Sequence, residues 1–220
     1  MLGPGMRADA IVDIGDVAGR RVAVIDSYFA QRTYKLLDLV IEDSARSAPL
    51  ADMVRLPDNP LPPLDLANAV RHAIEFGGGM MDPQLMRARR PDGSIDPDLV
   101  RGVRERMGQG RIWTVNGRAV LMTGHGHDPL FALRTGQTCV LDLANETAWA
   151  HPIHLHGVVF RVLSRNGRTP ARTEWRDTEL LHPGERATIA FAATEPGDWM
   201  FHCHVLEHQE TGMMGIFRIG

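Results

Sequence analysis

The sequence predicts an all-β protein, and three observations point to that class. Short runs of apolar and β-branched residues recur from residue 7 to 43 and again from residue 111 to the end of the chain. Asn-Gly pairs at 116–117 and 166–167 are typical of two-residue hairpin turns. The apolar runs are too short for a membrane span, which needs roughly 18 residues or more. Residues 111–220 are therefore expected to form a β-sandwich or barrel.

The N-terminal region, residues 1–44, contains three predicted strands. The segments are "RADAIVDIG" at 7–15, "RRVAVIDSY" at 20–28 and "YKLLDLVIED" at 34–43, and glycine or aspartate separates them. The next region, residues 45–110, holds eight of the fourteen prolines. Its stretch "PDNPLPPLD" is excluded from a central strand because proline has no amide N–H to donate. We interpret this region as a linker.

Two short helices are expected within the linker. The segment "DLANAVRHAIEF" at 65–76 carries apolar side chains at helical spacing. The second helix, at 97–107, follows Asp96 as its capping residue, begins with Pro97 and ends before Gly108.

Charge and composition exclude several classes of protein. The net charge is −3, with acidic and basic residues interspersed, so neither nucleic acid nor an anionic membrane surface is expected as a partner. The mean hydropathy of −0.17 and the 44% of hydrophobic residues are typical of a globular chain.

The start, "MLGPGMRADA", lacks the basic and apolar segments of a signal peptide. A disulfide between Cys139 and Cys203 is not expected if Cys203 binds a metal.

Six of the ten histidines lie in two short motifs, "HPIHLHG" at 151–157 and "HCHVLEHQETGMMG" at 202–215. In an extended strand, residues two apart face the same way, and the residue between them faces the other way. His202 and His204 are therefore expected on one face and Cys203 on the opposite face. His154 and His156 form a second pair on a common face. One strand can thus serve two metal sites.

One of these sites has the ligand types of a blue-copper centre. Such a centre combines a cysteine, two histidines and a weakly bound thioether. Cys203, His208 and Met213 are spaced five residues apart, so one loop can wrap round one ion. His151 is available as the second imidazole. Because Pro152 interrupts the hydrogen-bond ladder of the strand, the side chain of His151 need not face the same way as that of His154.

Two other interpretations of the cluster fit less well. A single histidine in a β-domain is usually a hydrogen-bonded structural residue, but here six histidines, one cysteine and one methionine fall within 63 residues. A zinc hydrolase would carry an HxHxDH pattern, whereas His125 and His127 are followed by Asp128 and Pro129. Zinc also has little use for a thioether such as Met213.

The two motifs resemble the copper signatures of the C-terminal cupredoxin domain in multicopper oxidases, the family of laccases and bacterial copper oxidases. The resemblance extends over 111–220 and includes "GDWMFHCHVLEH" and "HPGERATIAF". It implies a cupredoxin-like Greek-key β-sandwich for this region. It also implies that residues 1–44 are part of a middle cupredoxin domain, joined by the linker at 45–110. A periplasmic or extracellular location, with a small-molecule reductant and O2 as partners, follows from the same resemblance.

The resemblance further implies a role for each candidate residue. Type 1 copper would be bound by His151, Cys203, His208 and Met213. Half of the ligands of a type 2/type 3 trinuclear copper cluster would be His154, His156, His202 and His204. Electrons from phenols, other small reductants or Cu(I) would enter at type 1 copper and pass along the Cys203 backbone to His202 and His204, and the cluster would reduce O2 to water. Asp177 corresponds to an acidic residue that meets substrate near type 1 copper in some bacterial members, with a solvated strand-end aspartate as the alternative.

The sequence also departs from the family pattern. The family's cluster uses eight histidines, four of them from two HxH motifs of an N-terminal domain that this sequence does not show. The remaining HxH, His125–Gly126–His127, is interpreted as a polar turn. The opening stretch "LGPGMRADAIVDIG" resembles an internal strand of the middle domain. We therefore expect a truncated frame, a gene fragment or a split subunit.

Three functions stay open: a copper oxidase, an electron-transfer or copper-binding module with type 1 copper alone, and an inactive fragment. For the copper oxidase, an N-terminal domain, a partner chain or a homo-oligomer would complete the cluster.

Met80, Met81 and Met86 resemble the methionine-rich segments of copper-exporting oxidases, with packing on the domain surface as the alternative. His72 and His182 are expected to be structural or solvent-facing.

Overall fold

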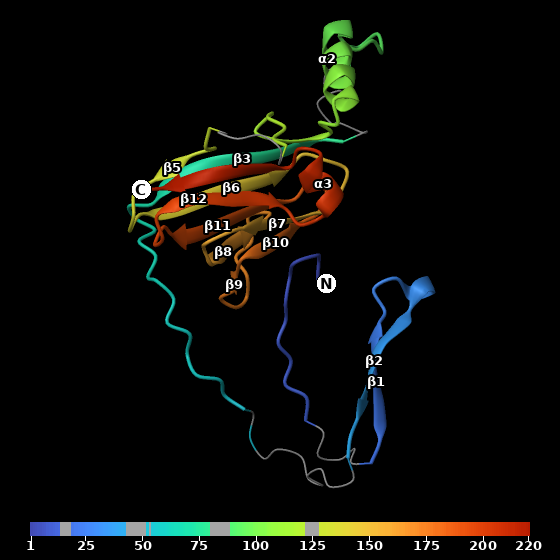
Figure 1. The fold of residues 1–220 in the computed structure, drawn as a ribbon, viewed down its shortest axis with the longest axis vertical. Coiled ribbons are helices and arrows are strands. Elements are labelled where there is room, and N and C mark those ends of the chain that lie inside the picture. Colours follow the sequence, from blue (N-terminus) through green and yellow to red (C-terminus); the bar gives the residue numbers. More distant parts are fainter. Residues whose placement is uncertain (14–18, 43–51, 53, 80–88, 122–127) are drawn as a thin grey trace. The chain divides into compact units, whose positions relative to one another are not determined.

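The computed structural model describes the chain except for residues 14–18, 43–51, 53, 80–88 and 122–127 (Figure 1). The chain divides into two compact units. One is made of Met1 and Arg7–Leu61, the other of Leu2–Met6 and Pro62–Gly220. None of the described helices is long and apolar enough to cross a membrane.

The smaller unit contains a β-hairpin. Strands β1 (Arg21–Asp26) and β2 (Tyr34–Val40) pair antiparallel, with a short 3-10 helix, η1 (Ala30–Arg32), in the connection. Two of the three strands predicted at this end are therefore confirmed. The third is wrong over its described part, because residues 7–13 are irregular and no described strand pairs with them.

The larger unit is a sandwich of two β-sheets, which confirms the predicted all-β class (Figure 1). The first sheet has five strands, in the spatial order β10 (Thr178–Leu181), β7 (His151–Leu155), β12 (Gly197–Cys203), β13 (Met214–Ile219) and β5 (Ala132–Leu133). The second has six, in the order β4 (Trp113–Val115), β3 (Val70–Gly78), β6 (Thr138–Asn145), β11 (Arg186–Ala192), β8 (Phe160–Arg165) and β9 (Trp175–Arg176). Neighbours in each sheet are mostly distant in sequence, as in a Greek-key sandwich.

The core of the sandwich follows the two-residue period of the strands. In β6, Cys139, Leu141 and Leu143 are at most 1% exposed. Phe76 of β3 stacks on Phe201 of β12 with the ring centroids 5.8 Å apart, which joins the two sheets. Each fully buried apolar side chain of this kind contributes roughly 1.5–3 kcal/mol to folding. Neither cysteine forms a disulfide, as expected.

Strand β3 corrects the sequence analysis. The helix predicted at 65–76 is wrong, because Val70–Gly78 forms a strand that pairs parallel with β6 and antiparallel with β4. Val70, Ala73 and Ile74 share one helical face, but the segment also fits the two-residue period of a strand. Ile74 and Phe76 are buried, and Glu75 between them is exposed. Pairing on both edges outweighs the local helix signal. A strand of the sandwich therefore lies inside the region expected to be linker.

The second predicted helix is confirmed as α2 (Pro97–Gly108). The Asp96 side chain accepts a hydrogen bond from a backbone amide of the first turn at 2.9 Å. Pro97 begins the helix, where its missing N–H has no intrahelical partner to lose. Gly108 is the last helical residue rather than the first one beyond the end. Gln109 closes the helix by donating its N–H to carbonyls of the last turn.

Both Asn-Gly turns are confirmed. The φ angles are 50° and 74° at Asn116 and Gly117, and 48° and 75° at Asn166 and Gly167. Positive φ at both central residues is the requirement of a type I′ turn, which matches the twist of the flanking strands. Two backbone hydrogen bonds close each turn.

Candidate metal centre

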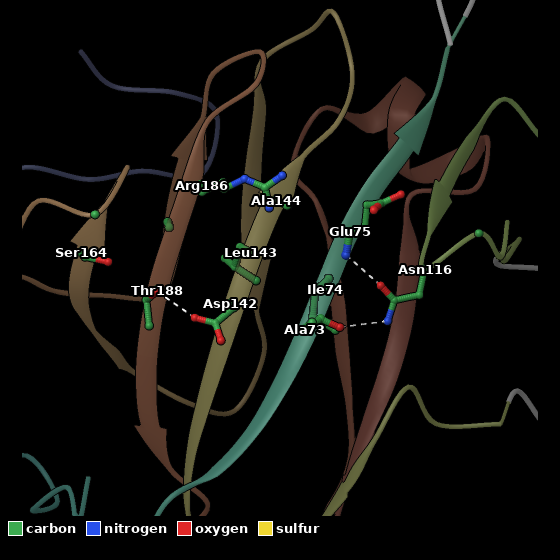
Figure 2. Close-up of a pocket in the computed structure, with 13 residues that line it drawn as sticks. Ala73, Ile74, Glu75, Asn116, Asp142, Leu143, Ala144, Ser164, Arg186 and Thr188 are labelled. Carbon is green, nitrogen blue, oxygen red and sulfur yellow. Dashed lines mark hydrogen bonds between the residues drawn. The ribbon is translucent and has the colours of Figure 1, made fainter. Parts of the chain in front are cut away.

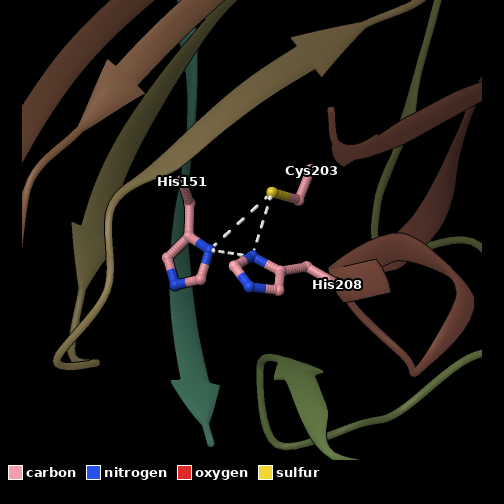
Figure 3. A group of neighbouring side chains, drawn as sticks. All are labelled: His151, Cys203 and His208. Atoms are coloured by element: carbon pink, nitrogen blue, oxygen red, sulfur yellow. Dashed lines mark hydrogen bonds between the residues drawn. The ribbon is translucent and has the colours of Figure 1, made fainter. Parts of the chain in front are cut away.

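Three donor side chains of the larger unit meet in what we call group 1: His151, Cys203 and His208 (Figure 3). His151 begins β7, and Cys203 ends the neighbouring strand β12. His208 lies on α3 (Leu206–Glu210), a short helix in the loop after β12 that the sequence analysis did not predict. His151 Nδ1 lies 3.0 Å from His208 Nδ1, and Cys203 Sγ lies 3.7 and 3.6 Å from these two nitrogens.

The spacing of group 1 fits one metal ion. The point equidistant from the three atoms lies about 2.0 Å from each, and a first-row ion such as zinc makes bonds of about 2.0 Å to nitrogen and 2.3 Å to sulfur. A thiolate with two imidazoles is also the equatorial ligand set of a blue-copper centre. The residues present therefore fit a copper ion.

Burial keeps the two imidazoles of group 1 neutral. It lowers the pKa of His151 to about 3, an effect to which the nearby His208 adds, and it also lowers the pKa of His208. A neutral ring offers a nitrogen lone pair to a metal at pH 7. Burial raises the pKa of Cys203 to about 12, so a metal must displace the thiol proton when it binds.

An indole that the sequence analysis did not single out covers group 1. Trp113, on β4, is 6% exposed, and its ring centroid lies 4.3 Å from that of His208 and 5.0 Å from that of His151. Gly79 lies against this indole, where an added Cβ would come within 2.8 Å of the ring. The only signal for Trp113 in the sequence was its place before the first Asn-Gly turn. That place predicts a strand but not what the strand covers.

A second set of side chains, group 2, lies on the other face of β7 and β12: His154, His156, His202 and His204. Donor atoms of the first three lie within 4.8 Å of one another. The Nε2 atoms of His156 and His202 are 3.0 Å apart. The ring centroid of His204 lies 5.7 Å from those of His154 and His202. Four imidazoles therefore share this face.

Backbone carbonyls orient two of these rings. His154 Nδ1 donates to the carbonyl of Asp177, and His202 Nδ1 donates to the carbonyl of Cys203, both at 2.8 Å. Since a carbonyl only accepts, each ring carries its proton on Nδ1 and keeps a lone pair on Nε2. Burial lowers the pKa of His202 to about 4, which keeps its ring neutral. Both rings can therefore present Nε2 to a metal.

The expected separation of the donors onto two faces is confirmed. Cys203 and His202 are neighbours in β12 and belong to different groups, and His202 lies in register with His154. The reason given for the direction of His151 is wrong, however. Pro152 stays in continuous register with β10, so the pairing is not interrupted there. His151 faces away from His154 because the two are three residues apart, an odd number.

The backbone of Met213 lies beside group 1, and Asp177 lies beside group 2. Met213 is fully buried, donates its N–H to the carbonyl of His208 at 2.9 Å and accepts from the N–H of Cys203 at 3.0 Å. The Asp177 carboxylate lies 3.8 Å from His154 Nδ1. The role of Met213 as a weak copper ligand and that of Asp177 as a substrate contact stay predictions.

Other candidates lie elsewhere. His72 stacks on Phe131 with the ring centroids 4.6 Å apart. Its packing fits a structural role. A further set lies outside the described residues: Met80, Met81, Met86, His125 and His127.

A hollow of about 810 Å³ lies on the six-stranded sheet (Figure 2). Residues of β3, β6 and β11 line it, together with both Asn-Gly turns. Asp142 accepts a hydrogen bond from the Thr188 hydroxyl at 2.9 Å, and the Asn116 side chain accepts one from the Glu75 amide at 2.7 Å. None of the lining residues is a histidine or a cysteine, so the hollow contains no donor of group 1 or group 2.

Comparison with known proteins identifies relatives. The multicopper oxidase family model matches residues 98–220. A multicopper oxidase of Staphylococcus epidermidis is 44% identical over 71 residues, which are 31% of this chain and 16% of that protein. A laccase of Haloferax volcanii is 29% identical over 220 residues, which cover 97% of this chain and 34% of the laccase.

Solved structures share the fold. A multi-copper oxidase from Pseudomonas thermotolerans is 26% identical and has a TM-score of 0.63, with 92% of this chain and 41% of the oxidase covered. A laccase-like multi-copper oxidase from Ochrobactrum sp. has the same TM-score of 0.63 at 24% identity and shows the fold alone. The chain spans between 16% and 34% of the length of the curated relatives compared. The family match covers more than half of the chain and includes both histidine motifs, and the chain therefore belongs to the multicopper oxidases, a family of copper-binding oxidoreductases.

Proposed function

We propose that this chain provides the type 1 copper site and half of the trinuclear site of a multicopper oxidase, which oxidises a small reductant and reduces O2 to water. The observation that carries the proposal is the order of residues at the end of β12. Cys203, from group 1, stands between His202 and His204, from group 2. The two groups are therefore joined by the covalent bonds of adjacent residues, a short path that suits the transfer of single electrons.

In group 1, His151 and His208 would bind copper through Nδ1 and Cys203 through Sγ, with Met213 as a weakly bound fourth ligand. Bound copper supplies one-electron redox chemistry at this position. Trp113 covers the two imidazoles and keeps water from them on that side. His208 is the least buried of the three donors, so we place the approach of the reductant on its side.

In group 2, four imidazoles would supply half of the ligands of a type 2/type 3 cluster. The orientation of His154 and His202 supports this, because their Nε2 lone pairs are free of hydrogen bonds to the backbone. An N-terminal domain, a partner chain or a second copy would supply the other ligands. The proposed reductants are phenols, other small molecules or Cu(I). The proposed location is periplasmic or extracellular.

A second function, electron transfer without O2 reduction, is favoured by the ligand count. The described donors of group 1 all lie in one unit of the chain. Group 2 offers four imidazoles, whereas the family's cluster is built from eight histidines. The chain alone would then bind copper at group 1 and exchange electrons with other redox partners.

Copper stoichiometry of the purified chain, measured together with electron paramagnetic resonance and O2 uptake, separates the two functions. The oxidase predicts three or more coppers per chain, a type 2 signal and O2 uptake with a phenol, either from a second copy of the chain or once a segment carrying two HxH motifs is added in trans. The electron-transfer module predicts close to one copper, a type 1 signal and no O2 uptake. A chain that retains no copper after dialysis would contradict both.

A further inference from the structure

A buried polar network precedes group 1. Asn145 ends β6 in one sheet, His151 begins β7 in the other, and Thr147 lies in the connection between them. The three side chains belong to residues that are at most 4% exposed. Each polar atom of the network must therefore find its partner within the protein.

The surroundings of Asn145 fix the orientation of its amide. Its Nδ2 lies 2.7, 3.1 and 3.0 Å from the carbonyl oxygens of Trp149, Leu181 and His182. Carbonyls only accept, so this end must be the NH2 group. The Asn145 Oδ1 therefore faces Thr147 and accepts from both its amide at 3.0 Å and its hydroxyl at 2.8 Å.

The orientation of Asn145 determines what Thr147 offers to His151. The hydroxyl has a single proton, and two oxygens that only accept lie within reach of it: Asn145 Oδ1 at 2.8 Å and the Trp149 carbonyl at 3.1 Å. The lone pairs of Thr147 Oγ1 are left for the N–H of Trp149 at 3.1 Å and for His151 Nε2 at 2.7 Å. With the hydroxyl proton on either of these oxygens, His151 carries its proton on Nε2. Its Nδ1, which faces Cys203 and His208 in Figure 3, keeps the lone pair.

We propose that Thr147, held by Asn145, is a positioning residue that selects the tautomer of His151 and aims its Nδ1 lone pair into group 1. The metal part of this inference rests on the proposed function, because it takes group 1 to be a copper site. A hydrogen-bond partner behind a histidine ligand fixes the ring and its tautomer, and removing such a partner typically lowers metal affinity about 10- to 100-fold.

Three variants separate this role from simple packing. Thr147→Val keeps the β-branched shape but leaves the buried Nε2–H of His151 without an acceptor. Thr147→Ser keeps the hydroxyl and loses only a methyl group. Thr138→Val is the matched control, since Thr138 is also a buried threonine and its hydroxyl accepts from the Asp65 amide at 2.9 Å, outside both groups.

The first measurement is the tautomer of His151 in the metal-free protein, from nitrogen NMR of histidine-labelled chain. The proton is expected on Nε2 in the wild type, in Thr147→Ser and in Thr138→Val. Thr147→Val is expected to show a mixture or the Nδ1–H form. A wild-type His151 protonated on Nδ1 overturns the proposal, even if Thr147→Val does not fold.

The second measurement is the affinity of the chain for one equivalent of Cu(II), by competition with a chelator. Thr147→Val is expected to weaken binding about 10- to 100-fold, whereas Thr147→Ser and Thr138→Val stay near the wild type. Equal losses in Thr147→Val and Thr147→Ser, or none in Thr147→Val, overturn the positioning role. A wild-type chain without a copper–thiolate band would contradict the proposed function instead, and the tautomer measurement would still test Thr147.

Discussion

Truncation of Trp113 to alanine should destabilise the larger unit and open group 1 to solvent. The indole is 6% exposed and contacts the rings of both His151 and His208. Removing a buried aromatic side chain costs about 3–5 kcal/mol, through lost burial and the cavity that remains. Trp113 lies on β4, a three-residue strand at the edge of its sheet, where the chain can relax into part of the cavity. We therefore expect a cost near the lower limit, about 3 kcal/mol.

Urea denaturation of the metal-free protein, followed by circular dichroism, measures this cost. Trp199→Ala is the matched control. Trp199 lies on β12 four residues before Cys203, about 13 Å along the strand, and its Nε1 donates to the carbonyl of Glu195 at 2.8 Å. It is only partly buried, so its truncation should cost less.

The copper-loaded variants test the covering role itself. Without the indole, a small anion such as azide should reach the metal and shift the visible band of Trp113→Ala. The wild type and Trp199→Ala should not respond. A cost below about 1 kcal/mol for Trp113→Ala, together with an unchanged response to azide, would refute the reasoning, because a side chain that covers group 1 must contribute to both.

Three further predictions concern the donors. Cys203→Ser should lose the intense visible band while circular dichroism shows a folded chain, because the thiolate gives the blue site its absorption; a retained band would exclude Cys203 as the ligand. Met213→Leu should keep the band and raise the reduction potential in a redox titration, because loss of a weak donor favours Cu(I); release of the copper would show Met213 to be a primary ligand. His204→Ala should keep most of the band and lose any O2 uptake, since His204 belongs to group 2. An equal loss of the band in His204→Ala and Cys203→Ser would contradict the separation of the two groups.

The two-faced arrangement of donors could be predicted because it depends on a local property of the backbone. Adjacent residues of a strand face opposite ways, so Cys203 and His202 had to separate once β12 was recognised as a strand. The same rule places His151 opposite His154, and the special role given to Pro152 was unnecessary.

Features that depend on distant partners could not be predicted in this way. Strand β3 was read as a helix because Val70, Ala73 and Ile74 share one helical face. The deciding fact is its pairing with β6, far along the chain. Nothing in the segment "WTVNG" shows that Trp113 covers two imidazoles. Likewise, the segment "NETAW" does not show that Thr147 contacts His151, because only the folded connection between the sheets brings them together.

The central claim is that Cys203, His151 and His208 bind copper, and X-ray absorption at the copper edge tests it most directly. The sample is the purified chain loaded with one equivalent of copper. The account predicts one short copper–sulfur bond with two imidazole nitrogens, and loss of the sulfur in Cys203→Ser. Coordination by imidazole nitrogens without sulfur would contradict it, since that result would place the tightly bound copper in group 2.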